Sequence, residues 1–359
     1  MCGVSHFEDI GGWPALLTRL LEREDLPAAD AYEAMSTILS GAATSAQLIA
    51  FVVALRAKGE TAEELSGLLD AVLRAATLVP LGEDLRSRAV DIVGTGGDRS
   101  HSVNVSTMSA LVVAGAGVPV CKHGARASSS KCGTADVLEA LGVAIELSPE
   151  GVLRCIEEAG IGFCMATRFH PAFRFAGPSR REIGIPTVFN LLGPMANPGR
   201  VRRSLIGVAN PVFAERMLGS LRSHGAVKAW VVHGNGLDEL STMGASTVLA
   251  LDKGEVSTFI IDPELLGLAP ATLGDLVGGD PAFNAAAARR VLAGDRGAHR
   301  DIVLLNAAAG LVVADAVNDI EQGLELAARS IDSGDAAATL QRFVDVSQAC
   351  AAEAADAAS

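Results

Sequence analysis

The chain has 359 residues, a formal net charge of -13 and 49% hydrophobic residues, enough for one large and one small domain or for two ordinary domains. The acidic balance, without any run of Lys and Arg, argues against nucleic acid or a membrane surface as a partner. Six scattered cysteines without a C-x-x-C pair predict neither disulfides nor zinc, and they favour a reduced, cytoplasmic protein.

The first 85 residues predict a small helical domain. Apolar residues recur at helical spacing in segments 13–23 and 30–39, and a third helix is expected over 44–57. Thr61 and Glu64 have the spacing of a capping box, which predicts a fourth helix that reaches about residue 78.

From residue 86 the pattern changes to short β-rich runs that alternate with helical segments, which is typical of a mostly parallel sheet. The expected strands are 89–93, 118–121, 143–147, 162–165, 205–209 and 229–233, followed by an antiparallel pair at 247–251 and 257–261. We therefore predict an α/β fold with a helical domain at 1–85, an α/β domain at 86–350 and a frayed tail at 351–359.

A glycine-rich segment follows the first expected strand. Gly94-Thr95-Gly96-Gly97-Asp98 leads to Asn104-Val105-Ser106-Thr107, which opens a helix. Glycines let backbone N–H groups approach a polyanion closely, and a helix N-terminus adds partial positive charge. The segment therefore predicts a phosphate site, with Ser106 able to bind a metal. The alternative is a tight strand–helix turn with an Asn or Ser cap.

Two further loops carry polar side chains after expected strands. Segment 122–131 holds two lysines and an arginine around a run of serines, at the place where open α/β sheets bind ligands. The adjacent carboxylates of Asp238 and Glu239 follow a later strand and could hold Mg²⁺, which prefers oxygen ligands and substrate phosphates. For each loop alone, a solvated polar turn is the alternative.

Taken in order, these loops resemble the anthranilate phosphoribosyltransferase family. The shared pattern is Gly-Thr-Gly-Gly-Asp, Asn-x-Ser-Thr, Lys-His-Gly-x-Arg and Asp-Glu, with further similar stretches at 169–171, 180–184 and 186–194. The similarity covers about residues 12–345. It implies a small helical domain joined by a segment near 172–200, a larger α/β domain, a substrate cleft between the two, and a homodimer formed through the helical domain.

The resemblance also implies a reaction: the phosphoribosyl group of 5-phosphoribosyl diphosphate passes to the amine of anthranilate, in tryptophan biosynthesis. The products would be N-(5-phosphoribosyl)anthranilate and diphosphate. Mg²⁺ would be held by Ser106, Asp238 and Glu239, mostly through the diphosphate. The acceptor would lie beside Gly94 and Arg180. The implied donor-binding residues are Gly94, Gly97, Asp98, Ser102, Asn104, Ser106, Thr107, Lys122 and Thr134, to which the second loop adds His123, Gly124, Arg126, Ser129 and Ser130.

Ala125 departs from the family pattern, because the family has an Asn there that contacts anthranilate. Loss of one hydrogen bond to a charged group costs about 1.5–3 kcal/mol, so this position bears on the choice of acceptor more than on the type of reaction. His170 is a candidate for shaping the acceptor pocket, and His123 is a candidate general base. A packing role is the alternative for each histidine.

The sequence leaves two other functions open and argues against a third. A pyrimidine nucleoside phosphorylase has the same fold and uses phosphate, and a phosphoribosyltransferase for another aromatic acid would explain Ala125. A nucleic-acid binder of this fold would need a basic surface, against which the net charge of -13 argues.

Overall fold

The N-terminal helices begin where threonine side chains can cap them. In the computed structural model, which describes residues 6–127 and 131–358, Thr44 and Thr61 accept hydrogen bonds from the backbone N–H groups of Gln47 and Glu64. Both form capping boxes, and the one at Thr61 was predicted. The helices of this part are α1 (His6–Asp9), α2 (Gly12–Leu21), α3 (Ala28–Leu39), α4 (Ser45–Lys58), α5 (Ala62–Ala75) and α6 (Glu83–Arg88).

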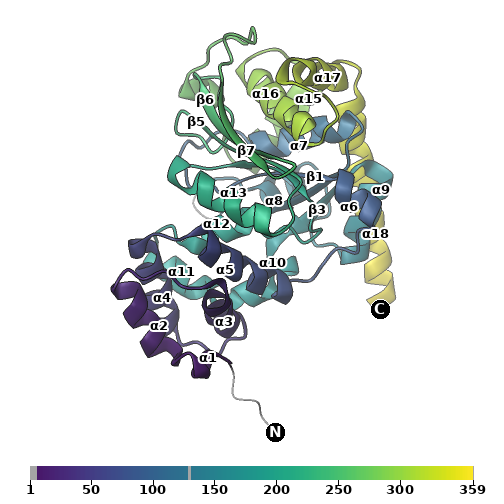
Figure 1. Ribbon diagram of the computed structural model, residues 1–359. Helices are drawn as coiled ribbons and strands as arrows, with labels where there is room; N and C mark the ends of the chain where they lie inside the picture. Colours follow the sequence, from purple (N-terminus) through teal and green to yellow (C-terminus); the bar gives the residue numbers. More distant parts are fainter. Residues whose placement is uncertain (1–5, 128–130, 359) are drawn as a thin grey trace.

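The larger part is built on one seven-stranded sheet in the order β3-β2-β1-β4-β5-β6-β7. Figure 1 shows this part above the N-terminal helices α1 to α5. The strands are β1 (Val90–Gly94), β2 (Val120–Gly124), β3 (Ile161–Met165), β4 (Arg203–Gly207), β5 (Lys228–Gly234), β6 (Ser246–Asp252) and β7 (Glu255–Ile261). The first five pair in parallel, and β6 and β7 add an antiparallel ribbon at one edge. The predicted small helical domain with a mostly parallel α/β domain is therefore confirmed.

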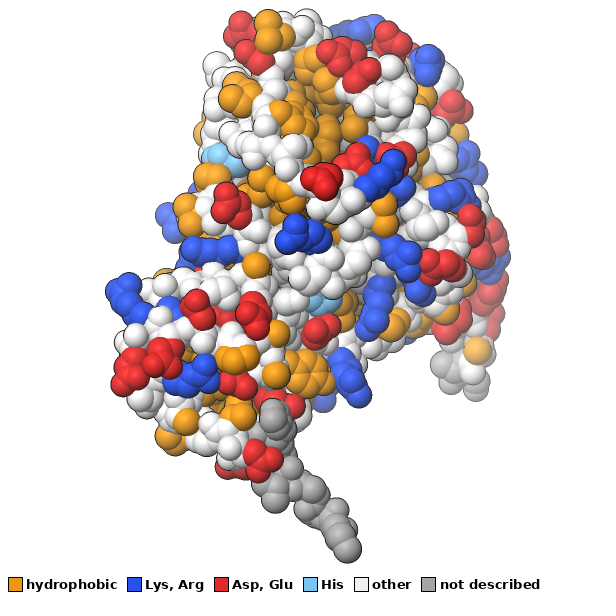
Figure 2. All heavy atoms as spheres, viewed as in Figure 1, with side chains coloured by type: hydrophobic (Ala, Val, Ile, Leu, Met, Phe, Trp, Pro, Cys, Tyr) orange, Lys and Arg blue, Asp and Glu red, His pale blue; other side chains and the backbone are white. Residues whose placement is uncertain are grey.

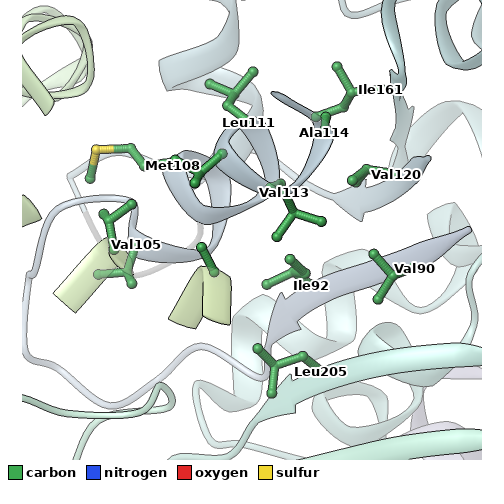
Figure 3. Close-up of a cluster of buried hydrophobic side chains, with 14 of the residues drawn as sticks. Val90, Ile92, Val105, Met108, Leu111, Val113, Ala114, Val120, Ile161 and Leu205 are labelled. Atoms are coloured by element: carbon green, nitrogen blue, oxygen red, sulfur yellow. The ribbon is translucent and has the colours of Figure 1, made fainter. Parts of the chain in front are cut away.

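Helices cover both faces of this sheet. Alternate residues of a strand point to opposite faces, so Leu205 of β4 packs in the core under α7 and α16, whereas Ile206 packs in the core shared with the helical domain. Figure 3 shows α7 lying on β1, with Val113 beside Ile92. The helices of this part are α7 (Val105–Gly115), α8 (Thr134–Ala140), α9 (Pro149–Ala159), α10 (Ala166–Phe169), α13 (Ala214–Ser223), α14 (Leu273–Leu276), α15 (Pro281–Leu292), α16 (Ala298–Val313), α17 (Ile320–Asp332) and α18 (Asp335–Ala358), with 3-10 turns at Pro171–Phe175 and Pro211–Phe213.

Two helices from the middle of the chain pack with the N-terminal bundle. Helix α11 (Gly177–Ile183) contacts α4, and α12 (Val188–Met195) contacts both α4 and α5. Phe189 and Leu192 of α12 belong to the same buried core as Phe51 of α4. The domain limit at residues 85 and 86 stays a prediction, since α6 runs across it.

Two local predictions are wrong. Segment 143–147 is not a strand: its apolar residues alternate because they pack into the core, and the Ala144 N–H donates to Ser347 Oγ of α18 (3.0 Å) instead of to a neighbouring strand. The tail at 351–358 does not fray but continues α18 to Ala358. Alanine favours helix, and Glu353 pairs with Arg154 of α9 (2.9 Å), so the last turns have a partner.

The surface agrees with the charge balance of the sequence. On the face shown in Figure 2, Lys and Arg side chains are interspersed with Asp and Glu and form no continuous basic area. Within the described ranges, no helix combines the length and the apolar character needed to cross a membrane.

Candidate active site

Four parallel strands end in glycine at the carboxyl edge of the sheet: β1 at Gly94, β2 at Gly124, β4 at Gly207 and β5 at Gly234. A Cβ atom on Gly94 or Gly207 would overlap with Asp238, and one on Gly234 would lie 2.6 Å from the carbonyl oxygen of the next residue, Glu239. These glycines therefore let the loop that carries Asp238 and Glu239, here called the acidic loop, lie directly on the strand ends. The connections of the neighbouring strands β1 and β4 leave to opposite sides, so the loop lies at the switch point where α/β sheets bind ligands.

The glycine-rich segment 94–107, which was predicted to bind the phosphates of the donor and is here called the donor loop, folds onto this acidic loop. Gly96 and Gly97 have φ angles of 67° and 81°, which glycine adopts without strain. The Gly96 N–H donates to Asp238 Oδ2 (2.6 Å), and the Ser106 N–H, at the N-terminus of α7, donates to Glu239 Oε1 (3.2 Å). Two motifs that are 142 and 133 residues apart in the chain at these contacts thus form one site.

Negative charge is concentrated where the two loops meet. Burial and the neighbouring carboxylate of Asp98 raise the pKa of Asp238 to about 7. Burial and the charge of Asp238 raise the pKa of Glu239 well above its usual range. Carboxylates brought together in this way favour a cation between them or a bound proton.

The donor atoms fit Mg²⁺, because Asp238, Glu239 and the Ser106 hydroxyl all offer oxygen. In the part of the chain that the structure describes, no group of three or more His, Cys, Asp or Glu side chains is arranged to hold a metal ion. The residues therefore provide part of a coordination shell, which phosphate oxygens and water would complete.

Lys122 lies beneath the donor loop. Its side chain is 1% exposed, and Nζ donates to the Ile92 carbonyl and to Ser106 Oγ (3.3 Å). Burial lowers the pKa of Lys122, and the charges of Asp91 and Glu239 oppose this effect. The lysine was predicted to bind the donor; in this structure it orients the Ser106 hydroxyl from below.

Arg126 forms ion pairs with helix α8. Its guanidinium is partly exposed and pairs with two carboxylates of α8, Asp136 (3.1 Å) and Glu139 (2.8 Å). A role as a phosphate ligand would require this arginine to exchange partners, and it stays a prediction. Ser129 and Ser130, also predicted to bind the donor, lie outside the described residues.

The other predicted donor residues lie along the same edge. Asn104 Nδ2 donates to the carbonyl oxygen of Cys132 (3.2 Å), which joins the donor loop to the second loop. Thr107 is 1% exposed, and its hydroxyl has no hydrogen-bond partner within the described residues. Thr134 begins α8 and lies so close to Gly124 that a Cβ there would approach it to 3.0 Å.

His123 and His170 lie side by side, with ring centroids 5.0 Å apart. His123 Nδ1 lies 3.1 Å from the Gly193 carbonyl oxygen, and His170 Nε2 lies 2.9 Å from that of Ala196. A carbonyl only accepts, so these nitrogens carry the protons and the opposite nitrogens carry lone pairs. Those lone pairs are buried without a partner among the described residues. Burial lowers the pKa of His123 to about 3 and that of His170 to about 4, so both rings are neutral at pH 7.

A row of rings leads from these histidines to Arg180. His170 stacks on Phe173 (5.2 Å between centroids), Phe173 meets Phe189 edge-on (5.6 Å), and the Arg180 guanidinium lies 4.9 Å from the Phe189 centroid. Among the described residues no carboxylate forms an ion pair with Arg180, and burial lowers its pKa. Ala125 is exposed just past the end of β2.

Asp91 is one supporting residue that sequence reasoning missed. Its Oδ2 accepts from Asn197 Nδ2 (2.7 Å), and its Oδ1 accepts from the backbone N–H of His123 (3.2 Å). Burial raises the pKa of Asp91 to about 6, against the lowering effect of the Lys122 charge. The available signal was a lone carboxylate within the apolar strand Val90–Gly94.

A strap near residues 276–284 also escaped the sequence analysis. Ser102 forms an antiparallel bridge with Val277, and Asn284 Nδ2 donates to Asn104 Oδ1 (2.8 Å). This segment thus fixes the donor loop at Ser102 and Asn104. These contacts join residues far apart in the chain, so no local pattern announced them.

Comparison with known proteins defines the class first. Residues 86–337 match the α/β domain of a glycosyl transferase family, and residues 14–76 match the helical bundle domain of the same family. The chain therefore belongs to this glycosyl transferase family.

Full-length relatives define the family more narrowly. Anthranilate phosphoribosyltransferase from Salinispora arenicola is 52% identical over 94% of this chain and 97% of its own length. The crystal structure of the Thermus thermophilus enzyme of that name has a TM-score of 0.87, 40% identity and coverage of 93% of this chain and 99% of that one. The Saccharomyces cerevisiae enzyme in complex with PRPP and Mg has a TM-score of 0.85, 30% identity and coverage of 94% and 98%; it has also been solved with 4-fluoroanthranilate. The chain belongs to the anthranilate phosphoribosyltransferase family.

Proposed function

We propose that the protein transfers the phosphoribosyl group of 5-phosphoribosyl diphosphate to the amine of anthranilate, with release of diphosphate. The carrying observation is the meeting of two predicted loops, in which Gly96 bonds Asp238 and Ser106 bonds Glu239. The family relationship supports this reaction, as do the yeast relative's complexes with PRPP and Mg and with 4-fluoroanthranilate.

Asp238, Glu239 and the Ser106 hydroxyl are the residues that would hold Mg²⁺. Burial, together with the negative charge of neighbouring carboxylates, raises the pKa values of both side chains, and a bound cation would offset both effects. When bound there together with the donor, Mg²⁺ would stabilise the charge that develops on the departing diphosphate.

The protein's own contribution to the reaction is positioning. The bond between the anomeric carbon and the diphosphate oxygen breaks, while a bond from the acceptor nitrogen to that carbon forms on the opposite face. The nitrogen then loses one proton to solvent. Backbone N–H groups around Gly96 and Ser106 stabilise the leaving diphosphate. An aniline-type nitrogen is neutral at pH 7, so attack needs no strong base, in agreement with the depressed pKa of His123.

The acceptor would lie along the row of rings. Arg180, which has no carboxylate partner among the described residues, would bind the carboxylate of anthranilate. The free lone pairs of His123 and His170 would accept hydrogen bonds from an amine that must present its own lone pair to the donor. This arrangement orients the nitrogen without removing a proton from it.

The direct test is diphosphate release from 5-phosphoribosyl diphosphate and anthranilate. Activity should require a divalent cation and disappear on exhaustive chelation. The double variant Asp238→Asn, Glu239→Gln should lower kcat/KM about a thousandfold, because the metal contributes several kcal/mol to leaving-group stabilisation. Glu264→Gln removes an exposed acid elsewhere and is the matched control. Undiminished activity after chelation would refute the metal assignment.

Ala125 favours a second candidate acceptor, a ring-substituted or larger aromatic amino acid. A panel of aminobenzoates assayed for diphosphate release separates this possibility from anthranilate itself. The resemblance further leads us to propose a cytoplasmic location and a homodimer formed through the helical domain; sedimentation measurements test the dimer.

A further inference from the structure

The acidic loop is tied to the core by an asparagine from a helix behind it. Leu240, directly after the acidic pair, donates its backbone N–H to Asn306 Oδ1 (2.9 Å). The carbonyl oxygen of Leu240 accepts from Asn306 Nδ2 (2.8 Å). One side-chain amide, 66 residues further along the chain, therefore satisfies both polar groups of Leu240.

Asn306 is an unexpected residue for its position. It is 0% exposed within the stretch Ile302–Val313 of α16, every residue of which is buried. A buried amide is costly unless its polar atoms are bonded. Here the second Nδ2 hydrogen donates to the Ile302 carbonyl (2.9 Å), so every Asn306 donor has an acceptor. The cost of the amide is offset by contacts made mainly to the acidic loop.

The backbone of the acidic loop is fixed at three successive residues. The Asp238 carbonyl lies over Gly207, the Glu239 carbonyl lies over Gly234, and Leu240 is held by Asn306. None of these restraints uses a carboxylate. The backbone that carries both carboxylates is therefore held independently of the hydrogen bonds that Gly96 and Ser106 donate to them, and Asn306 supplies the restraint at Leu240.

We propose that Asn306 is a positioning residue for the metal and diphosphate site. By holding Leu240, it keeps Asp238 and Glu239 directed at the space beside Ser106, and it touches neither substrate nor cation. The inference rests on the proposed function, specifically on the metal assignment. A residue with only a packing role would affect stability and leave cation binding unchanged.

The test uses Asn306→Leu, which keeps the approximate size and shape of the side chain but removes all three hydrogen bonds. Binding of Mn²⁺ in the presence of inorganic diphosphate is measured by electron paramagnetic resonance, without turnover. We expect about tenfold weaker Mn²⁺ binding, the scale observed when a residue supporting metal ligands is lost. The metal concentration for half-maximal activity should rise similarly, with the acceptor KM unchanged.

Ser330→Ala is the matched control. Ser330 is buried, and its hydroxyl donates to the Val112 carbonyl (2.8 Å) near the end of α7 opposite to Ser106. This variant should lower the melting temperature without changing Mn²⁺ affinity. If Asn306→Leu does not fold, Asn306→Ser, which leaves room for a water molecule, takes its place.

The outcomes are distinguishable. Wild-type affinity in the Asn306 variants would overturn the inference, as would an equal loss of Mn²⁺ binding in Ser330→Ala. If the wild-type protein itself binds no Mn²⁺ with diphosphate, the metal assignment fails and the inference fails with it. Weakened binding confined to the Asn306 variants supports the positioning role.

Discussion

The two halves of the candidate site are built differently. On the donor side, most of the polar groups named above already have partners: Gly96 and Ser106 bond the acidic pair, and Lys122 bonds Ser106, while the Thr107 hydroxyl is the exception. On the acceptor side, two buried ring nitrogens, His123 Nε2 and His170 Nδ1, have no hydrogen-bond partner among the described residues. In the donor half the polar groups mostly bond one another, whereas in the acceptor half they are left without partners.

Under the proposed function, this difference predicts how each half would bind its ligand. A metal-bound diphosphate would exchange with contacts that the donor loops make among themselves, so that half would depend on backbone geometry. An aromatic acid can add contacts without breaking any, so the acceptor half depends on individual side chains. Backbone changes should therefore damage the donor side most, and side-chain changes should act selectively on the acceptor side.

Among single substitutions, the largest effect is expected from Gly207→Ala. The added methyl group would overlap with the Asp238 carbonyl and move the acidic loop off the strand end. A displacement of about 1 Å at reacting groups can cost a hundredfold in rate, so kcat/KM for the donor should fall by at least that factor. Gly82→Ala is the control, because no atom lies within 4 Å of a Cβ placed there. Equal kinetics for both variants would contradict the close approach at Gly207.

Arg180→Ala should have the next largest effect, and it should be selective. Loss of a charge-assisted hydrogen bond costs about 1.5–3 kcal/mol, which corresponds to a tenfold to hundredfold rise in the acceptor KM. The donor KM should stay nearly constant. The neighbouring Arg174→Ala removes an exposed arginine from the same region and should change neither constant. Equal effects of Arg180→Ala on both substrates would indicate a structural arginine.

The sequence indicated more of the residues that meet at the strand ends than of the residues in the row of rings, for a physical reason. Glycines and a helix start that cradle phosphate form a contiguous pattern, as at Gly94–Asp98, and a parallel sheet brings its strand ends to one edge. Tertiary contacts have no local sequence pattern. Phe173 and Phe189 come into contact in the row of rings only through the fold, and the same is true of Asp91, which accepts the backbone N–H of His123. The strand expected at 143–147 failed because burial against α18 produces the same alternation as a sheet.

A smaller effect concerns stability and pH. The pKa of His170 falls from 6.5 to about 4 on burial, so between these values the unfolded chain binds a proton that the folded chain does not. The contribution of buried, neutral His170 to the free energy of unfolding is therefore fully present above pH 6.5 and is lost as the pH falls toward 4. His170→Gln should make the decrease in the free energy of unfolding across this pH window smaller by about 1–3 kcal/mol, as measured by denaturant unfolding at several pH values. His101→Asn, at an exposed histidine, should leave the slope unchanged.

The smallest effect is expected at Ala125, where the family's acceptor-binding Asn is missing. Ala125 is exposed, while the backbone of this loop is held independently by a hydrogen bond from the Ala135 N–H to the Ala125 carbonyl (3.1 Å). A change of side chain should thus leave the donor side intact. We expect Ala125→Asn to tighten anthranilate binding by about tenfold, the scale of one hydrogen bond to a charged group.

Three outcomes at Ala125 can be told apart by steady-state kinetics with anthranilate and ring-substituted anthranilates. Tighter anthranilate binding with an unchanged donor KM means that the missing amide left an open position. Weaker use of substituted acceptors by Ala125→Asn means that the alanine makes room for a larger ring. No change means that a water molecule replaces the amide, since a bridging water is nearly as favourable as a direct contact. If the variant uses anthranilate less well and the wild type prefers no analogue, Ala125 neither lacks a useful acceptor contact nor makes room for a larger ring, and the proposed role of this position in acceptor choice is wrong.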